Sequence, residues 1–285
     1  MGEAPIDHAK FSFMGRSVAI ATEEASVVPA LSALMDIRVE DSGPADYCVT
    51  VRHDGESIAV ETKVDCKRYE TPDDAIVALA QAVPYFLLPY ARGFILHGGA
   101  LIADGKAHLF LGPGFVGKST IALEAWLMGY EVLGDDYLWL DPTAAVVQAV
   151  PKPLKLRRKD NSLPEQLVPL LAPGTYRIGQ ADRQWALLLS RGLPRMAPLH
   201  RGFPVGGIHL LERTDESASV LRPADKHEFV QSIFGHLAKG PHNNLDIVRC
   251  LSGVFYSGRV TRLRVGRGCA AAAVSAMIAS ESSQT

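Results

Sequence analysis

A nine-residue segment, Gly112–Thr120, constrains the fold of this chain more than any other part of its sequence. It reads Gly-Pro-Gly-Phe-Val-Gly-Lys-Ser-Thr and satisfies the G-x-x-x-x-G-K-[ST] pattern, whose glycines free backbone N–H groups to wrap a polyphosphate. An apolar run, Ala107–Leu111, comes directly before it, and a helix is predicted over residues 119–128, where Gly129 ends it. Strand, glycine-rich loop and helix therefore follow one another in the order that a phosphate-binding loop requires.

Composition excludes several classes of protein. The 285 residues are 47% hydrophobic and 21% charged, with a net charge of −2, which argues against a general nucleic-acid or membrane-surface binder. The four cysteines lie far apart, without a C-x-x-C pair that would indicate zinc or a disulfide framework. The sequence shows no signal region, and its longest C-terminal apolar stretch is too short to span a bilayer. We therefore expect a cytoplasmic protein with small or locally recognised partners.

We expect an α/β protein made of two unequal parts. Residues 1–90 alternate strand-like runs with helical stretches, which predicts a small α/β module; its role in recognising a substrate or partner is a hypothesis. Residues 91–285 contain the glycine-rich loop and form the second part. Within it, residues 151–204 are rich in Pro, Gly and Arg with weak periodicity, so we expect surface loops and short helices there.

The strand before the loop is predicted to belong to an antiparallel hairpin. Asp104-Gly105 separates two apolar runs within residues 94–111, and this dipeptide is a strong signal for a two-residue hairpin turn. Most phosphate-binding loops follow a strand of a parallel sheet, so the hairpin indicates a particular subclass.

Three further residues suit phosphoryl transfer, which needs a carboxylate that accepts a proton from the attacking hydroxyl. Asp135 and Asp136 follow a predicted strand one helix after the loop, where a metal-binding aspartate is expected. A solvated turn is the alternative interpretation of an Asp-Asp pair, and the preceding loop favours the functional one. His97, before two glycines, has an imidazole suited to hydrogen bonding or proton transfer, although a packed histidine is the alternative.

The spacing of these residues resembles the catalytic domain of the HPr kinase/phosphorylase family. That pattern has a His-Gly pair, a phosphate loop starting fifteen residues after the His, an Ala-Leu-Glu helix, a closing Gly and an Asp-Asp pair. This chain matches it without a gap at His97-Gly98, Gly112, Ala122-Leu123-Glu124, Gly129 and Asp135-Asp136. The resemblance covers residues 93 to 142 and implies a P-loop kinase core of the type shared with phosphoenolpyruvate carboxykinase.

Carried over to this chain, the resemblance implies that Lys118 binds the phosphates of ATP and that His97 is an active-site residue. Asp136 would accept the proton of a serine hydroxyl, while Ser119 and Asp135 would hold Mg²⁺; the division of roles between the two aspartates stays open. The nucleotide is expected to contact Gly112, Pro113, Gly114, Phe115, Val116, Gly117, Lys118, Ser119 and Thr120.

The chain departs from the family in two ways. The family loop carries Ser-Gly where this chain has Gly114-Phe115, and the later Glu-Ile-Arg-Gly-type signature is not found, which argues against HPr as the acceptor. Arg157, in a basic stretch, and Arg249 are weaker candidates for substrate contacts; a solvated loop is the alternative for Arg157.

The prediction is therefore an ATP-dependent kinase that phosphorylates a serine-type hydroxyl of a peptide, protein or small molecule. The alternative is a nucleotide-sensing regulatory or adaptor protein without phosphotransfer. Family members often form rings or dimers, so the oligomeric state stays open.

Overall fold

The chain folds into two compact units that are each built from two separate stretches of sequence. The computed structural model describes residues 7–40, 43–88, 93–141, 143–235, 237–238, 245, 248–252 and 259–282. The first unit comprises Met1–Pro89 and Pro151–Leu193, and the second comprises Tyr90–Val150 and Pro194–Thr285. The predicted boundary near residue 90 is thus incomplete, because residues 151–193 belong with the first unit.

A six-stranded sheet forms the centre of the first unit, in the order β3-β1-β2-β4-β5-β6. Its inner face carries alternate apolar residues such as Phe11, Ile20 and Val49, all buried, as expected for strands with one covered face. The strands are β1 (Asp7–Phe13), β2 (Arg16–Thr22), β3 (Val39–Glu40), β4 (Tyr47–Asp54), β5 (Ser57–Glu61) and β6 (Cys66–Tyr69).

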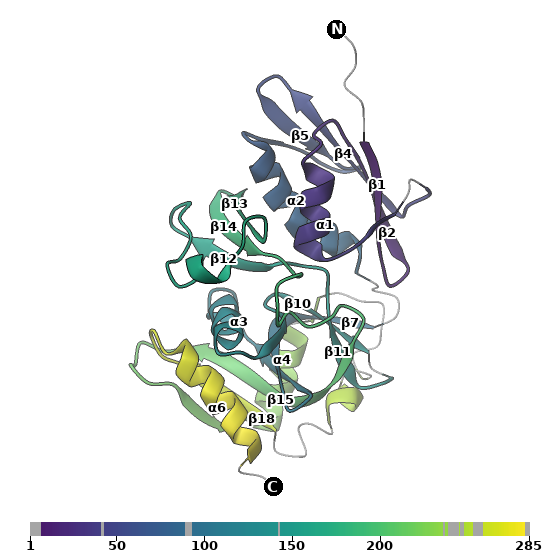
Figure 1. Ribbon diagram of the computed structural model, residues 1–285. Helices are drawn as coiled ribbons and strands as arrows, with labels where there is room; N and C mark the ends of the chain where they lie inside the picture. Colours follow the sequence, from purple (N-terminus) through teal and green to yellow (C-terminus); the bar gives the residue numbers. More distant parts are fainter. Residues whose placement is uncertain are drawn as a thin grey trace. The chain divides into compact units, whose positions relative to one another are not determined.

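Helices α1 (Val27–Met35) and α2 (Pro72–Phe86) pack side by side against this sheet (Figure 1). The start of α2 follows the sequence signals: the Thr71 hydroxyl accepts a hydrogen bond from the N–H of Asp74, and Pro72 occupies the first turn. The module predicted for the N-terminal region is therefore mixed α/β.

Residues 151–193 form a small sheet, contrary to the loops and short helices expected there. Its order is β12-β14-β13, all antiparallel, from β12 (Leu154–Arg158), β13 (Tyr176–Ala181) and β14 (Gln184–Leu189). A single short 3₁₀ turn, η1 (Val168–Leu170), lies within this segment. The carboxylate of Asp74 at the start of α2 accepts a hydrogen bond from the N–H of Gln180 at 2.6 Å. Contacts with α2 thus hold β13 in place, which local composition does not reveal.

The second unit contains a nine-stranded sheet whose main path runs β11-β10-β7-β8-β15-β18-β16. β8, β15 and β18 are parallel to one another, so their carboxyl ends lie at one edge. β11 also pairs with β15, which closes a ring of pairings through β10, β7 and β8. The strands are β7 (Phe94–Ala103), β8 (Lys106–Leu111), β9 (Glu131–Gly134), β10 (Tyr137–Asp141), β11 (Val146–Ala149), β15 (Gly202–Arg213), β16 (Val220–Pro223), β17 (Leu237–Ala238) and β18 (Val260–Val265).

The predicted hairpin is confirmed: β7 and β8 are antiparallel, with Ala103 opposite Lys106. Asp104 and Gly105 between them have φ angles of 48° and 73°, as a two-residue turn with a left-handed backbone requires. The strand before the glycine-rich loop therefore has an antiparallel partner on one side, β7, and a parallel one on the other, β15.

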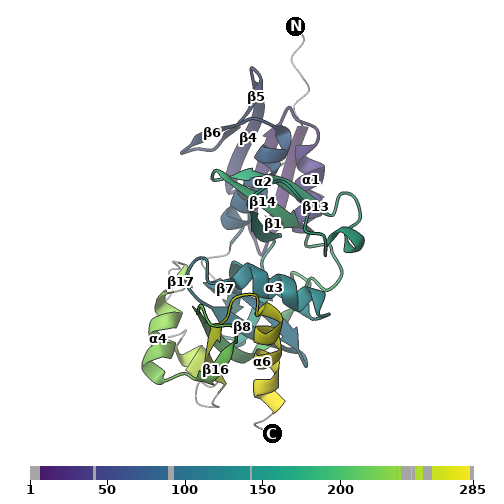
Figure 2. The same ribbon diagram turned by 90° about the vertical axis from the view of Figure 1, so that its left-hand side faces the viewer.

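Helices flank the sheet of the second unit on both faces. α3 (Lys118–Leu127) and α6 (Ala270–Ser282) contact each other, and Figure 2 shows α4 (Lys226–Gly235) on the opposite flank. Among the described residues, no helix combines the length and the apolar character needed to cross a membrane. All four cysteines are free thiols.

Gly99 on β7 permits the close approach of β8. A Cβ atom at Gly99 would overlap Cε2 of Phe110 and lie 2.8 Å from the carbonyl oxygen of Gly134. Replacing Gly99 with alanine should therefore lower the free energy of unfolding by about 1–3 kcal/mol through overpacking, measured by denaturant unfolding. Gly114→Ala is the matched control, because nothing lies within 4 Å of its Cβ position. Equal unfolding midpoints for the two variants would contradict the packing argument.

Candidate active site

The glycine-rich loop lies between the end of β8 and the first turn of α3. Gly117, with φ of 108°, is the N-cap residue of α3, and this left-handed backbone favours glycine. The Nζ atom of Lys118 turns back and donates hydrogen bonds to the carbonyl oxygens of Gly112 at 2.7 Å and Pro113 at 3.0 Å. The buried ammonium is thereby held at the start of the loop, and the N–H groups of the first helical turn remain available to an anion.

Phe115 stands out within the loop. Its backbone has φ of 65°, a conformation uncommon for a bulky residue, and its side chain is 69% exposed. Val116 beside it is buried, whereas Pro113, Gly114 and Thr120 are exposed. The loop therefore presents an aromatic ring at its tip, at the cost of backbone strain.

The structure brings together His97 and Asp136, two of the residues that the sequence predicted for an active site. Their Nε2 and Oδ1 atoms are 2.9 Å apart, and both side chains are partly exposed. The strand pairing explains the contact: His97 on β7 is opposite Tyr137 on β10, and the N–H of Gly98 donates to the carbonyl oxygen of Asp136 at 3.1 Å. A carboxylate and an imidazole thus form a hydrogen-bonded pair that water and substrates can reach.

This pair lies beside the start of the glycine-rich loop. Gly98 is opposite Leu111 in the β7–β8 ladder, so His97 is level with Gly112, the first residue of the loop. The antiparallel hairpin therefore places His97 and the start of the loop at the same end of the sheet, and Asp136 joins them from the turn before β10.

Asp135 occupies a different environment from its neighbour. It follows β9 and is 4% exposed, while Ser119 lies in the first turn of α3. Hydroxyl and carboxylate oxygens are the hard ligands that Mg²⁺ takes together with the phosphates of a substrate. These two residues have the chemistry that Mg²⁺ requires. The described part of the chain has no group of three or more His, Cys, Asp or Glu side chains that could hold a metal ion.

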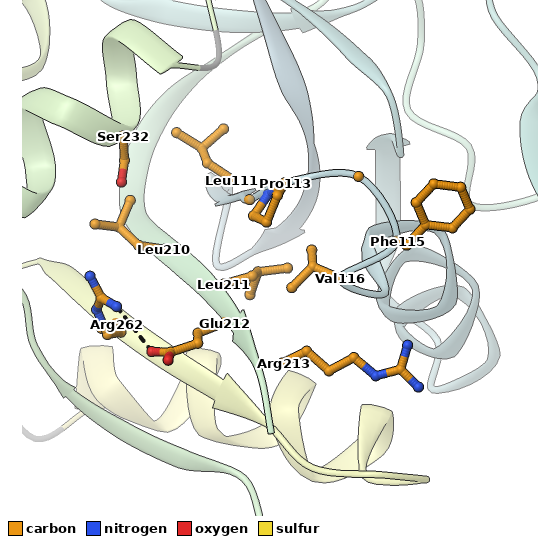
Figure 3. Close-up of a pocket in the computed structure, with 12 residues that line it drawn as sticks. Leu111, Pro113, Phe115, Val116, Leu210, Leu211, Glu212, Arg213, Ser232 and Arg262 are labelled. Atoms are coloured by element: carbon orange, nitrogen blue, oxygen red, sulfur yellow. Dashed lines mark hydrogen bonds and ion pairs between the residues drawn. The ribbon is translucent and has the colours of Figure 1, made fainter. Parts of the chain in front are cut away.

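Two pockets adjoin the loop, and both are lined by Phe115, Val116 and Arg213. The large pocket, of about 560 Å³, extends along the end of β15 to Ser232 of α4 and Arg262 of β18 (Figure 3). The small pocket, of about 210 Å³, is bounded by the first turn of α3 and by residues 265–270 before and at the start of α6.

Ion pairs fix the wall of the large pocket. Arg262 contacts Glu212 and Glu228, each at 2.9 Å. A hydrogen bond from Arg222 lowers the pKa of the Glu228 carboxyl, which keeps it ionised beside two guanidinium groups. These ion pairs therefore form a charged border to the large pocket.

Sequence reasoning missed Arg213, which lines both pockets. Arg213 is the last residue of β15 and follows closely after the buried Leu210 and Leu211. The sequence did contain a signal for Arg213. Charged residues at the carboxyl end of a buried parallel strand lie at the edge of the sheet where α/β proteins bind ligands.

The two arginines proposed as substrate contacts, Arg157 and Arg249, line neither of the two pockets beside the loop. Arg157 lies on β12 of the first unit. Arg249 is exposed in a short helical stretch, residues 248–252, and lines neither pocket.

No protein-family model matches the chain, and no significant match was found among curated proteins. Among solved structures, the chain is similar to the Hpr(Ser) kinase/phosphatase from Coxiella burnetii, with 11% sequence identity and a TM-score of 0.31. The match covers 67% of this chain and 97% of that structure.

Proposed function

We propose that this protein is a kinase that transfers the γ-phosphoryl group of ATP to a serine-type hydroxyl of a peptide, protein or small molecule. The observation that carries the proposal is the 2.9 Å contact between His97 and Asp136, level with the first residue of a loop that matches the phosphate-binding pattern. A carboxylate beside a phosphate loop supplies the proton acceptor that transfer to an alcohol needs.

The residues divide the reaction between them. Asp136 takes the proton of the acceptor hydroxyl, whose oxygen forms a bond to the γ-phosphorus while the bond to the β,γ-bridging oxygen breaks and ADP leaves. His97 holds one carboxylate oxygen of Asp136 and so orients it. Lys118 and the N–H groups of the loop bind the phosphates. Mg²⁺, held by Ser119 and Asp135, would neutralise charge on the transferred group.

Mass spectrometry of acceptors tests the proposal. The full chain is incubated with ATP, Mg²⁺ and a panel of free serine, serine-containing peptides and HPr. We expect one acceptor to gain the mass of one phosphate, and we expect Lys118→Met to abolish the gain because the ammonium at the loop is lost. Lys106→Met is the matched control, since Lys106 begins β8 at the end remote from the loop.

Two outcomes would contradict the kinase assignment. The first is ATP binding without phosphate gain on any acceptor, which favours a nucleotide-sensing protein. The second is equal transfer by wild type and Lys118→Met, which would place the reaction elsewhere.

A further inference from the structure

The glycine-rich loop separates two pockets, and the proposed function requires that one of them hold the nucleoside part of ATP. The order of strands gives the direction in which the nucleotide extends. His97 lies on β7, on one side of β8, whereas the ends of β15 and β18 lie on the other side. Because the transferred phosphate must meet Asp136 and His97, the rest of the nucleotide extends away from β7, toward β15 and β18.

Both pockets lie in this direction, and the small pocket is the one at the end of the loop that leads into α3. It contains Gly117 and Thr120 of the loop and first helical turn, and Val265 at the end of β18. The Nζ atom of Lys118 is fixed at the opposite end of the loop, by Gly112 and Pro113. The terminal phosphates therefore lie near Gly112, and the nucleoside lies beyond Thr120.

Positive charge converges on the small pocket from several elements. The N-termini of α3 and α6 both border it, at Gly117 and Ala270, and helix N-termini favour anions. Arg213 reaches it from the end of β15, and Arg267 reaches it from the loop before α6. The Arg267 side chain is paired with Asp215 at 2.9 Å, so Arg213 is the better placed of the two to contact a phosphate.

Phe115 supplies the apolar surface that a base requires. Its strained, 69% exposed side chain lies at the tip of the loop, and Figure 3 shows the ring at the end of the loop remote from Ser232 and Arg262, with Arg213 extending toward that end. Aromatic rings stack on any nucleobase, because every base presents a π face. A bulky residue at a left-handed position is strained, and strain of this kind is found at ligand-binding sites.

We infer that the small pocket binds the nucleoside of a nucleoside triphosphate, with Phe115 stacked on the base and Arg213 contacting the phosphate next to the ribose. This inference rests on the proposed function. It adds one binding residue, Arg213, a stacking role for Phe115, and a direction: the nucleoside lies on the side of β15 and β18, and the acceptor enters on the side of β7 and β10.

Calorimetric titration of the full chain with two ligands tests the inference: ATP and inorganic tripolyphosphate, each with Mg²⁺. Phe115→Gly removes the ring and suits a backbone φ of 65°, so the loop keeps its conformation. We expect this variant to weaken ATP binding by about 5- to 100-fold and to leave tripolyphosphate binding unchanged. Arg213→Gln should weaken both ligands by about 10-fold. Arg264→Gln is the control, because Arg264 pairs with Glu216 at 3.2 Å and lines neither pocket.

The outcomes separate this inference from the proposed function. Unchanged ATP affinity in Phe115→Gly, or an equal loss for ATP and tripolyphosphate, would overturn base stacking while leaving the kinase assignment intact. Unchanged affinities in Arg213→Gln would remove that residue from the site. If wild-type protein binds neither ligand, the proposed function fails and the inference fails with it.

Discussion

Replacing Asp136 with asparagine is expected to lower kcat for phosphoryl transfer by about 10²- to 10⁴-fold, the contribution that a positioned general base makes. The substitution keeps the shape of the side chain and its position beside His97, 2.9 Å away in the wild type, but removes its ability to take the acceptor proton. Because Asp136 is not required to hold the nucleotide, the dissociation constant for ATP should change by less than about 3-fold, within the effect of an ordinary surface substitution.

Asp104→Asn is the matched control for this variant. Asp104 lies in the turn at the other end of β7 from His97, and asparagine tolerates its left-handed backbone. Single-turnover kinetics with the identified acceptor would measure the chemical step. A kcat within a few-fold of wild type in Asp136→Asn would show that the carboxylate is not the base, and would shift attention to Asp135.

Acid should destabilise the second unit through a buried histidine. His209 on β15 is 1% exposed and hydrogen-bonds on both sides, to Nδ1 of His108 at 3.2 Å and to the hydroxyl of Thr261 at 2.8 Å. Burial, and next the neighbouring His108, lower the pKa of His209 to about 3. Since the ordinary pKa of histidine is about 6.5, the unfolded chain takes up a proton at a pH where the folded chain does not.

The sign and size of the effect follow from that difference. The stabilisation is complete above about pH 6.5 and is lost as the pH falls toward 3, so lowering the pH from 7 to 5 should cost about 2 kcal/mol of unfolding free energy. Urea unfolding followed by tryptophan fluorescence would measure it. A Trp185→Phe background confines the signal to Trp126 and Trp139, which both belong to the second unit.

His209→Gln keeps a hydrogen-bonding side chain at this position but cannot titrate, so its stability should depend less on pH between 7 and 5. His53→Gln is the control, since His53 is half-exposed in the first unit, 3.8 Å from Glu24. Equal pH dependence in wild type and His209→Gln would show that other groups cause the acid sensitivity.

The sequence predicted those features that depend on neighbouring residues. The turn at Asp104-Gly105 and the helix after Lys118 both arise from local backbone preferences, and the structure has both of them. The contact of His97 with Asp136 joins residues 39 positions apart. The resemblance to a known family singled out both residues, but it did not predict that they contact each other.

The small sheet of the first unit could not be predicted in this way. Its β13–β14 turn uses Asp182 and Arg183 at φ angles of 52° and 62°, without the glycine that signals such a turn. Contacts made far along the sequence stabilise it, including an ion pair between Arg177 and Asp73 at 3.0 Å. Arg213 was missed for a similar reason, because its place beside the loop depends on which strands are neighbours in the sheet.

Each unit is made of two separate stretches of sequence, and the first unit's second stretch ends earlier in the chain. The residues of the first unit are therefore all synthesised before the second unit is complete. The ribosome has made every residue of the first unit once Leu193 is added. At that moment β8 has its partner β7 but still lacks β15. β8 is the strand that precedes the glycine-rich loop. An unpaired strand edge is prone to pair with other chains. The nascent protein therefore completes its first unit while the strand beside its candidate active site still has an open edge.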